Sequence, residues 1–181
     1  MMYELTLHII DIVHNSIRAN ASQIEVKIID SLKSDKIIIE IIDNGIGMDE
    51  ETIQRVQDPF YTTKKEKTVG LGVPLLKQTA NHCDGEFFIK SELGKGTIVH
   101  AEFKKSHIDL PPIGNLSDTF LTLLTYDDEN INIILNYETD KGKFSISTSE
   151  IKNEIGDVPL SSPEVISFLK SYIKENLEIL K

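Results

Sequence analysis

The sequence predicts an α+β protein that forms one domain, or one domain with a small appendage. Residues 4–19 carry apolar side chains at helical spacing, which indicates an amphipathic helix. Ile24, Val26 and Ile28 alternate with charged residues, as in a half-buried strand. Residues 37–42 form a nearly continuous apolar run, which is typical of a more central strand. A chain of 181 residues is long enough to bury its own core.

The remaining elements follow from periodicity and from turn and cap residues. Asp49 is expected to cap a short helix that ends before Pro59, and Ser162 with Pro163 is a typical helix start. In chain order, we expect a loop over 58–72, a helix to about 83, strands near 87–89 and 97–103, a linker over 107–114, a helix over 115–125, a hairpin of 131–137 with 143–147, a short helix over 149–155 and a last helix to about 180.

Charge and composition exclude several classes of function. The formal net charge is −10, and the densest basic stretch is the short, interrupted run at 64–67, so we expect no nucleic-acid partner. The single cysteine, Cys83, fits a reducing compartment. The N-terminus lacks the features of a signal peptide, and no apolar run approaches the ~20 residues that span a bilayer. We therefore expect a cytoplasmic protein that binds no membrane.

The strongest local motif is the Asp43–Gly47 loop, which directly follows the predicted central strand. A carboxylate at the end of a buried strand can accept a hydrogen bond from the amino group of adenine. The two glycines let a flat ligand approach the backbone closely. The alternative is a tight turn whose aspartate caps the next helix.

Gly70, Leu71 and Gly72 stand at the start of a predicted helix, where free amides and the helix dipole favour an anion. The spacing is neither that of a P-loop nor that of a dinucleotide fingerprint. A flexible hinge is the alternative.

Asp11, Asn15 and Arg18 are spaced by four and three residues and share the polar face of the first helix with His8. Asn15 can give a carbonyl oxygen to Mg²⁺, Asp11 can orient or deprotonate a water or hydroxyl, and Arg18 can meet a phosphate. The alternative is the solvated face of an amphipathic helix.

The loop at 58–64 combines hydroxyls and an ammonium next to the predicted phosphate site. Such a loop suits a lid that closes on a triphosphate, with Phe60 as its apolar anchor. An exposed loop with one core aromatic residue is the alternative.

The order of these motifs is more specific than any one of them. A helix with Asp-x-x-x-Asn, a strand ending in Asp-x-Gly-x-Gly, a Pro-Phe-x-x-Thr-Lys loop, a Gly-x-Gly helix start and Gly-x-Gly-Thr before a last strand follow one another over residues 4 to about 105. This arrangement resembles the ATP-binding domain shared by gyrase, heat-shock chaperones, histidine kinases and mismatch-repair ATPases. The resemblance implies a two-layer α/β sandwich, in which helices cover one face of a mixed sheet.

The resemblance also implies a role for each matching residue. Asp43 binds the adenine amino group, with Thr97 helping through water, while Gly45, Gly47 and Met48 frame the adenine pocket. Asn15 holds Mg²⁺ on the triphosphate. The implied phosphate contacts come from Arg18, from the phenylalanine box (Phe60, Thr62, Thr63, Lys64) and from the second glycine box (Gly70, Leu71, Gly72).

Two departures from the family pattern bear on activity. Gyrase-type hydrolases carry Glu where Asp11 stands, so Asp11 is a less certain general base, and the chain is too short for the second domain that supplies their lysine. The ATP-domain helix begins within the first few residues, which leaves no room for the helical hairpin that presents a phosphoacceptor histidine in histidine kinases. Gyrase-like turnover is therefore not expected.

The leading hypothesis is an ATP-binding domain over residues 1–106 that acts as a kinase, either like a histidine kinase or like an anti-sigma serine kinase. It transfers the γ-phosphate to a separate protein or hydrolyses ATP slowly, in a signalling role. The alternative is a nucleotide-gated switch that binds a partner without catalysis. In either case residues 107–181 form an α+β extension for docking or dimerisation.

Overall fold

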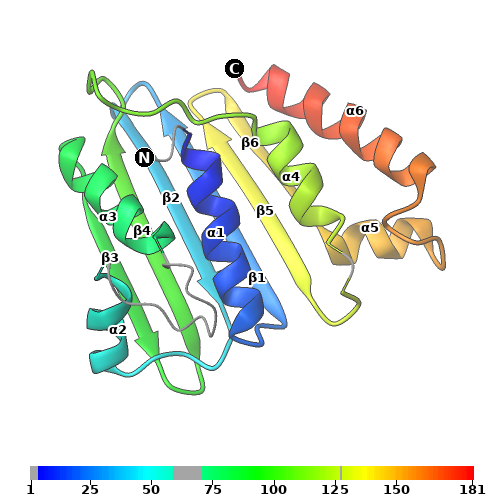
Figure 1. Cartoon of the computed structure of the whole chain (residues 1–181). Helices are drawn as coiled ribbons and strands as arrows, with labels where there is room; N and C mark the ends of the chain where they lie inside the picture. Colours follow the sequence, from blue (N-terminus) through cyan, green and yellow to red (C-terminus); the bar gives the residue numbers. More distant parts are fainter. Residues whose placement is uncertain (1–3, 59–70, 127) are drawn as a thin grey trace.

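The computed structural model describes residues 4–58, 71–126 and 128–181. Figure 1 shows a single mixed sheet with the helices on one of its faces. The strands are β1 (Gln23–Ser31), β2 (Lys36–Asp43), β3 (Phe87–Glu92), β4 (Gly96–Lys104), β5 (Asn132–Thr139) and β6 (Gly142–Ser147). The helices are α1 (Leu5–Arg18), α2 (Glu50–Val56), α3 (Gly72–His82), α4 (Leu116–Leu124), α5 (Thr148–Ile155) and α6 (Pro163–Ile179). The predicted two-layer sandwich is confirmed.

The sheet has six strands in the order β3-β4-β2-β1-β5-β6. All neighbours are antiparallel except β1 and β5, which are parallel. In the centre of the sheet Ile28 of β1 pairs with Ile39 of β2. Alternate residues of β1 and β2 are buried, as the period-2 pattern predicts. The run over residues 37–42 is therefore central, as expected.

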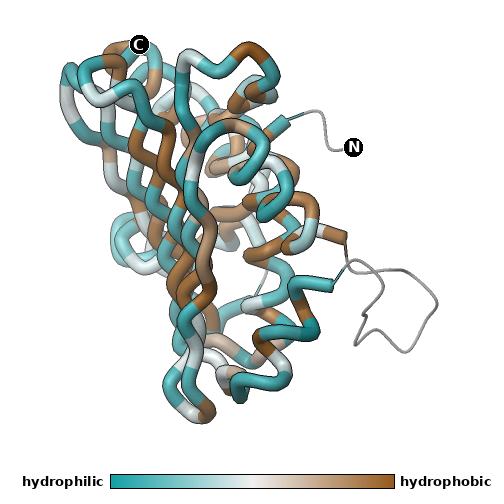
Figure 2. Tube along the Cα trace, turned by 90° about the vertical axis from the view of Figure 1, so that its left-hand side faces the viewer, coloured by the Kyte–Doolittle hydropathy of each residue, from teal (hydrophilic) through white to brown (hydrophobic). Residues whose placement is uncertain are grey.

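The helical layer packs its apolar stripes on the sheet. Helix α1 packs on β1 and β2, and its side chains Leu5, Ile9 and Val13 are fully buried. Each such side chain contributes about 1.5–3 kcal/mol by leaving water. Figure 2 shows the two layers from the side. No helix among the described residues is long and apolar enough to span a membrane.

The opposite face of the sheet carries charged side chains. Glu40 of β2 forms an ion pair with Lys27 of β1, with N and O 3.8 Å apart, and its carboxylate lies 3.1 Å from the His100 ring nitrogen of β4. The Phe88 ring stacks on that of His100, with centroids 4.5 Å apart. No described helix covers this face (Figure 1).

The C-terminal extension has the predicted α+β content, but its strands continue the sheet formed by residues 4–106. Strand β5 pairs in parallel with β1, from Gln23 and Asn132 to Asp30 and Thr139. Phe120 and Leu135 belong to the same core cluster as the side chains of α1. The boundary between 106 and 107 therefore marks a change in sequence pattern and does not divide the sheet or the core. A docking role for the extension stays a prediction.

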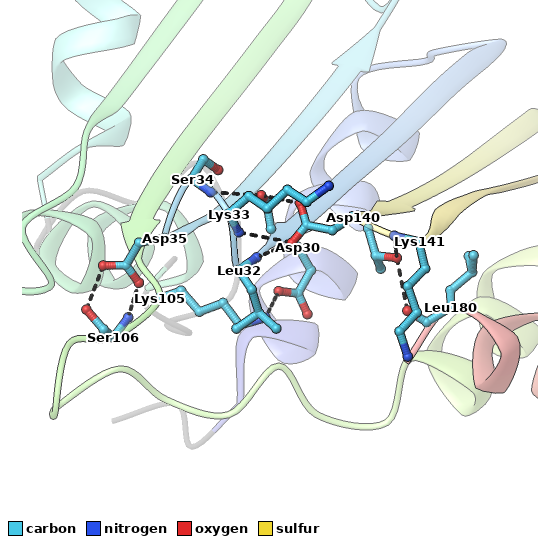
Figure 3. Close-up of polar contacts among 12 residues, drawn as sticks. Asp30, Leu32, Lys33, Ser34, Asp35, Lys105, Ser106, Asp140, Lys141 and Leu180 are labelled. Atoms are coloured by element: carbon cyan, nitrogen blue, oxygen red, sulfur yellow. Dashed lines mark hydrogen bonds and ion pairs between the residues drawn. The ribbon is translucent and has the colours of Figure 1, made fainter.

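Polar contacts at one end of the sheet also connect the extension to the β1–β2 turn (Figure 3). The Asp140 carboxylate, in the β5–β6 turn, accepts from the Ser31 hydroxyl at 2.7 Å and from the amides of Leu32 and Lys33 at 2.7 and 3.0 Å. The β1–β2 turn is thus held by the β5–β6 turn. In the linker, the carbonyls of Pro112 and Ile113 accept from the first amides of α1.

The helix caps follow the sequence with one correction. The Asp49 carboxylate accepts from the Thr52 amide at 2.8 Å, so the predicted cap of α2 is confirmed. Ser162 occupies the N-cap position of α6, yet its hydroxyl makes no capping hydrogen bond. That hydroxyl is buried and has no hydrogen-bond partner among the described residues. The prediction that the Ser162 side chain caps α6 is therefore wrong.

Candidate functional site

A cavity of about 750 Å³ opens between α1, α2, the start of α3 and the ends of β2, β3 and β4 nearest to them. Its lining is mostly apolar at one end and polar along α1. The lining residues are Asp11, Ile12, Asn15, Ser16, Arg18, Ala19, Asp43, Ile46, Gly47, Met48, Asp49, Thr52, Val56, Gly72, Val73, Ile89, Leu93, Thr97 and Val99. The volume and the apolar walls with a few polar groups are typical of a small-molecule site.

Asp43 is the buried polar group of this cavity. It is the last residue of β2, and only 9% of it is exposed. One carboxylate oxygen accepts from the Ser16 hydroxyl at 2.6 Å, and the other accepts from the Gly45 amide at 2.9 Å. A carboxylate has about four acceptor positions, so two donors leave capacity for a ligand amino group. The carboxylate is held in place and can still bind.

Ser16 was not predicted as a site residue. It is 3% exposed and lies on the buried face of α1, where it follows the apolar stripe through Ile12 and Val13. A hydroxyl in an apolar stripe needs a hydrogen-bond partner, because burying it alone is costly. That interruption of the stripe is a sequence signal that could have identified the residue.

Thr97 of β4 lies next to Asp43 of β2, which is its cross-strand partner. Its hydroxyl is 2.8 Å from that of Ser91, which also reaches the Gly96 carbonyl at 2.8 Å and accepts from the Met48 amide at 2.8 Å. A hydroxyl has one proton, so a serine that donates to Gly96 must accept from Thr97. Thr97 then keeps its lone pairs for a ligand or a water. Ser91, which was also not predicted, holds Thr97 and Met48 together.

The loop after β2 is fixed by close backbone contacts. Gly47 has φ +69°, and a Cβ there would overlap the Glu92 carbonyl, so only glycine fits. The Asn44 side chain accepts from the amides of Ser22 and Gln23 at 2.9 Å. Gly45 packs on Ala19 behind the cavity and is not among its lining residues. It acts on the site through its hydrogen bond to Asp43.

The three polar residues predicted on α1 line the cavity together. The Asn15 amide oxygen accepts from the Arg18 guanidinium at 2.7 Å, and that guanidinium also donates to the His14 carbonyl at 3.2 Å. An amide oxygen suits Mg²⁺, and it has a second lone pair beside the one that Arg18 uses. The described residues contain no cluster of three or more His, Cys, Asp and Glu side chains that could hold a metal.

Leu71 and Gly72 form the start of α3, as expected. Gly72 lines the cavity, whereas Leu71 is the N-cap residue and is 40% exposed. A Cβ on Gly72 would overlap the Asp11 carboxylate, so this glycine lets α1 and α3 approach each other closely. The predicted site residues Phe60, Thr62, Thr63, Lys64 and Gly70 lie outside the described residues.

The sequence placed His8 on the polar face of α1, and this prediction is wrong. His8 is 1% exposed, and neither ring nitrogen has a hydrogen-bond partner among the described residues. Burial lowers the pKa of its imidazole below the ordinary value, against smaller opposing effects of the Gly72 backbone and the Asp11 carboxylate. The ring is therefore neutral at pH 7.

Comparisons with known proteins agree with this geometry. Residues 4–107 match the family model described as histidine kinase-, DNA gyrase B- and HSP90-like ATPase. Sporulation kinase E of Bacillus subtilis is 42% identical over 72 residues, which are 40% of this chain and 10% of that protein. A putative sensor protein of Shewanella frigidimarina is 34% identical over 103 residues, which are 56% of this chain and 16% of that protein. The chain thus spans only a small part of these relatives.

A solved structure supports the fold beyond the matched domain. The N-terminal domain of a DNA repair protein superposes with a TM-score of 0.55 at 20% sequence identity, over 80% of this chain and 52% of that one. At this identity the likeness concerns the fold alone. The family match covers more than half of the chain and all the described cavity residues. The chain therefore belongs to the histidine kinase-, DNA gyrase B- and HSP90-like ATPase family.

Proposed function

We propose that this protein binds ATP with Mg²⁺ in the cavity and acts as a kinase in a signalling pathway. In this role it transfers the γ-phosphate to a separate protein or hydrolyses ATP slowly, and it works in the cytoplasm. The observation that carries the proposal is Asp43, a buried carboxylate that is oriented by two donors and has acceptor positions left at the more apolar end of the cavity. An adenine amino group is the donor that such a site lacks.

The cavity divides into an adenine end and a phosphate end. Asp43 and Thr97 meet the base, and Gly47 and Met48 lie beside it. At the other end the free amides at the start of α3 and the Arg18 guanidinium attract the phosphates. Bound Mg²⁺ neutralises phosphate charge, and the Asn15 amide oxygen is its protein ligand. Asp11 lies beside Gly72 at this end, where its carboxylate can orient an attacking hydroxyl.

One observation favours the second candidate, a nucleotide-gated switch. Helix α1 lines the cavity, contacts α4 of the extension and donates its first backbone N–H groups to carbonyls of the linker. A shift of α1 on nucleotide binding would therefore reach residues 107–181 directly. A surface of the extension can then bind a partner in one nucleotide state only.

The Asp43→Ala variant tests the adenine site. We expect calorimetry to show ATP and adenosine binding weakened at least about 100-fold, because a charged-group hydrogen bond and its geometry are both lost. Glu40→Ala is a matched control, since it removes a carboxylate from the same strand on the opposite face. Adenosine binding that survives Asp43→Ala would contradict the assignment.

The fate of a labelled γ-phosphate distinguishes the kinase, the ATPase and the switch. The protein is incubated with γ-labelled ATP, Mg²⁺ and a cell lysate. Label on another protein supports the kinase, and release of free phosphate alone supports an ATPase. Binding with neither supports the switch. Each signal should vanish in Asp43→Ala.

A further inference from the structure

His8 is a buried polar group that the proposed site does not use. It lies on α1 one turn before Asp11, and both of its ring nitrogens are without a hydrogen-bond partner among the described residues. An unpaired polar group in a core costs stability, and a leucine of similar size would avoid that cost. Such a group in a native structure calls for a functional reason.

The surroundings of the ring indicate which partner it serves. Its protonated form is favoured by the Gly72 backbone and by the Asp11 carboxylate. A backbone group that favours a cation is an acceptor, so the Gly72 carbonyl is the group that faces the imidazole. Helix α3 packs against α1, and its first residue, Gly72, lies against Asp11, one turn along α1 from His8. Among the described residues the ring makes no hydrogen bond to that carbonyl.

Gly72 connects this ring to the phosphate end of the cavity. It is the first residue of α3, it lines the cavity, and it lies against the Asp11 carboxylate. The backbone N–H groups in the first turn of a helix have no carbonyl partner within that helix. The direction of these amides depends on the position of Gly72, which lies against the Asp11 side chain of α1.

We propose that His8 is a positioning residue for the phosphate end of the nucleotide. In the ATP-bound protein its ring N–H donates to the Gly72 carbonyl and fixes the first turn of α3, so that the free amides of that turn point at the phosphates. The proposal rests on the proposed ATP binding. It assigns His8 no contact with ATP and no part in phosphoryl transfer.

Two substitutions separate positioning from packing. His8→Leu removes the unpaired nitrogens, so its unliganded form should melt at or above the wild-type temperature. Its ATP affinity should fall about tenfold, the effect of one hydrogen bond, with adenosine affinity unchanged. His8→Asn keeps an N–H donor and should recover part of the ATP affinity. Thr6→Val, a buried polar position two residues away on α1, is the matched control and should alter neither ligand.

The outcomes distinguish this proposal from the proposed function. Wild-type protein that binds neither ATP nor adenosine contradicts both. Wild-type ATP affinity in His8→Leu, or equal loss of ATP and adenosine, leaves ATP binding intact as a proposal and overturns the role of His8. If His8→Leu does not fold, nitrogen NMR of the wild-type His8 ring decides. We expect its shifts to change when ATP is added and to stay constant with adenosine, and unchanged shifts with ATP overturn the proposal.

Discussion

At the scale of single residues, the site consists of a few groups whose neighbours fix their orientation. Asp43 is the example, because its two oxygens are set by donors from two different elements, the Ser16 hydroxyl of α1 and the Gly45 amide of the loop. Ser91 does the same for Thr97 and Met48. A base that enters the cavity meets acceptors that are already in position, so little ordering is needed on binding.

Ser16→Ala tests this orientation. The Asp43 carboxylate loses one buried donor, so we expect adenosine affinity to fall about 3–10-fold and stability to fall by about 1–3 kcal/mol. Calorimetry and urea denaturation measure the two effects. Ser145→Ala, at an exposed serine of β6, serves as the control. Full adenosine affinity in Ser16→Ala would show that Asp43 does not depend on this hydroxyl.

The sequence identified the residues of this site whose type is rare for their setting. Asp43 ends an apolar strand, and Asp11, Asn15 and Arg18 of α1 line the cavity, while their roles in binding a nucleotide stay predictions. Ser91 was not predicted because a serine is unremarkable in a strand, and Ser16 was not predicted because only its place in the apolar stripe of α1 distinguishes it. His8 was placed on the wrong side of α1, since a histidine among polar neighbours fits both faces until the packing of α3 is known.

At the scale of elements, the contact between α1 and α3 is set by one missing side chain. Gly72 leaves room for the Asp11 carboxylate, and any larger residue there would overlap it. At this point the Asp11 carboxylate of α1 occupies the space that a Cβ on α3 would need. The end of the cavity that we propose for the phosphates is bounded by this contact.

A double-mutant cycle tests the contact. Gly72→Ala should destabilise the protein by about 1–3 kcal/mol, because the new methyl group overlaps Asp11. Asp11→Ala removes the obstacle, so the double variant should recover most of that loss. Urea denaturation of all four proteins gives the coupling. Strictly additive effects would show that the helices do not meet through these two residues.

The β5–β6 turn provides a second test at this scale, through pH. The Ser31 hydroxyl, and then the backbone amides of Lys33 and Leu32, hold the pKa of Asp140 below its ordinary value. A carboxylate whose pKa is lower in the folded protein than in the unfolded chain stabilises the fold at pH values above its ordinary pKa of about 3.9. This contribution is lost as the pH falls through the folded pKa. Asp140→Asn should therefore melt below wild type at pH 7 and close to it near the lower pKa.

Thermal melts at several pH values measure this difference. Asp157→Asn, at an exposed aspartate, is the control and should follow wild type at every pH. A gap between wild type and Asp140→Asn that stays constant down to acid pH would show that the carboxylate is not the stabilising group.

At the scale of the whole molecule, the family domain and the extension form one sheet and one core. Strand β5 pairs with β1, and α4 and α6 bring Phe120 and Leu169 into the cluster that contains the side chains of α1. Local periodicity predicted nearly all these elements and their bounds. It could not predict the β1–β5 pairing, because an alternating pattern fixes which face of a strand is buried and not which strand lies beside it.

A chain that ends at residue 106 tests this unity. It would expose the β1 edge and the core side chains that Ile133 and Leu135 now cover. We expect it to aggregate or to lack a cooperative melt, as judged by circular dichroism and light scattering, because long unpaired edges pair with other chains. A monomeric fragment that melts near the wild-type temperature would contradict a shared core.

The pairing of β1 with β5 also sets the timing of folding during synthesis. β1 begins at residue 23 and β5 at residue 132, so a ribosome adds 109 residues (132 − 23) between the two starts. At about 5–20 residues per second, that interval is roughly 5–20 s. Throughout it the nascent sheet has an open edge along β1, the strand that β5 later covers. Rare codons or pauses before residue 132 should therefore lower the yield of native protein more than pauses within α6.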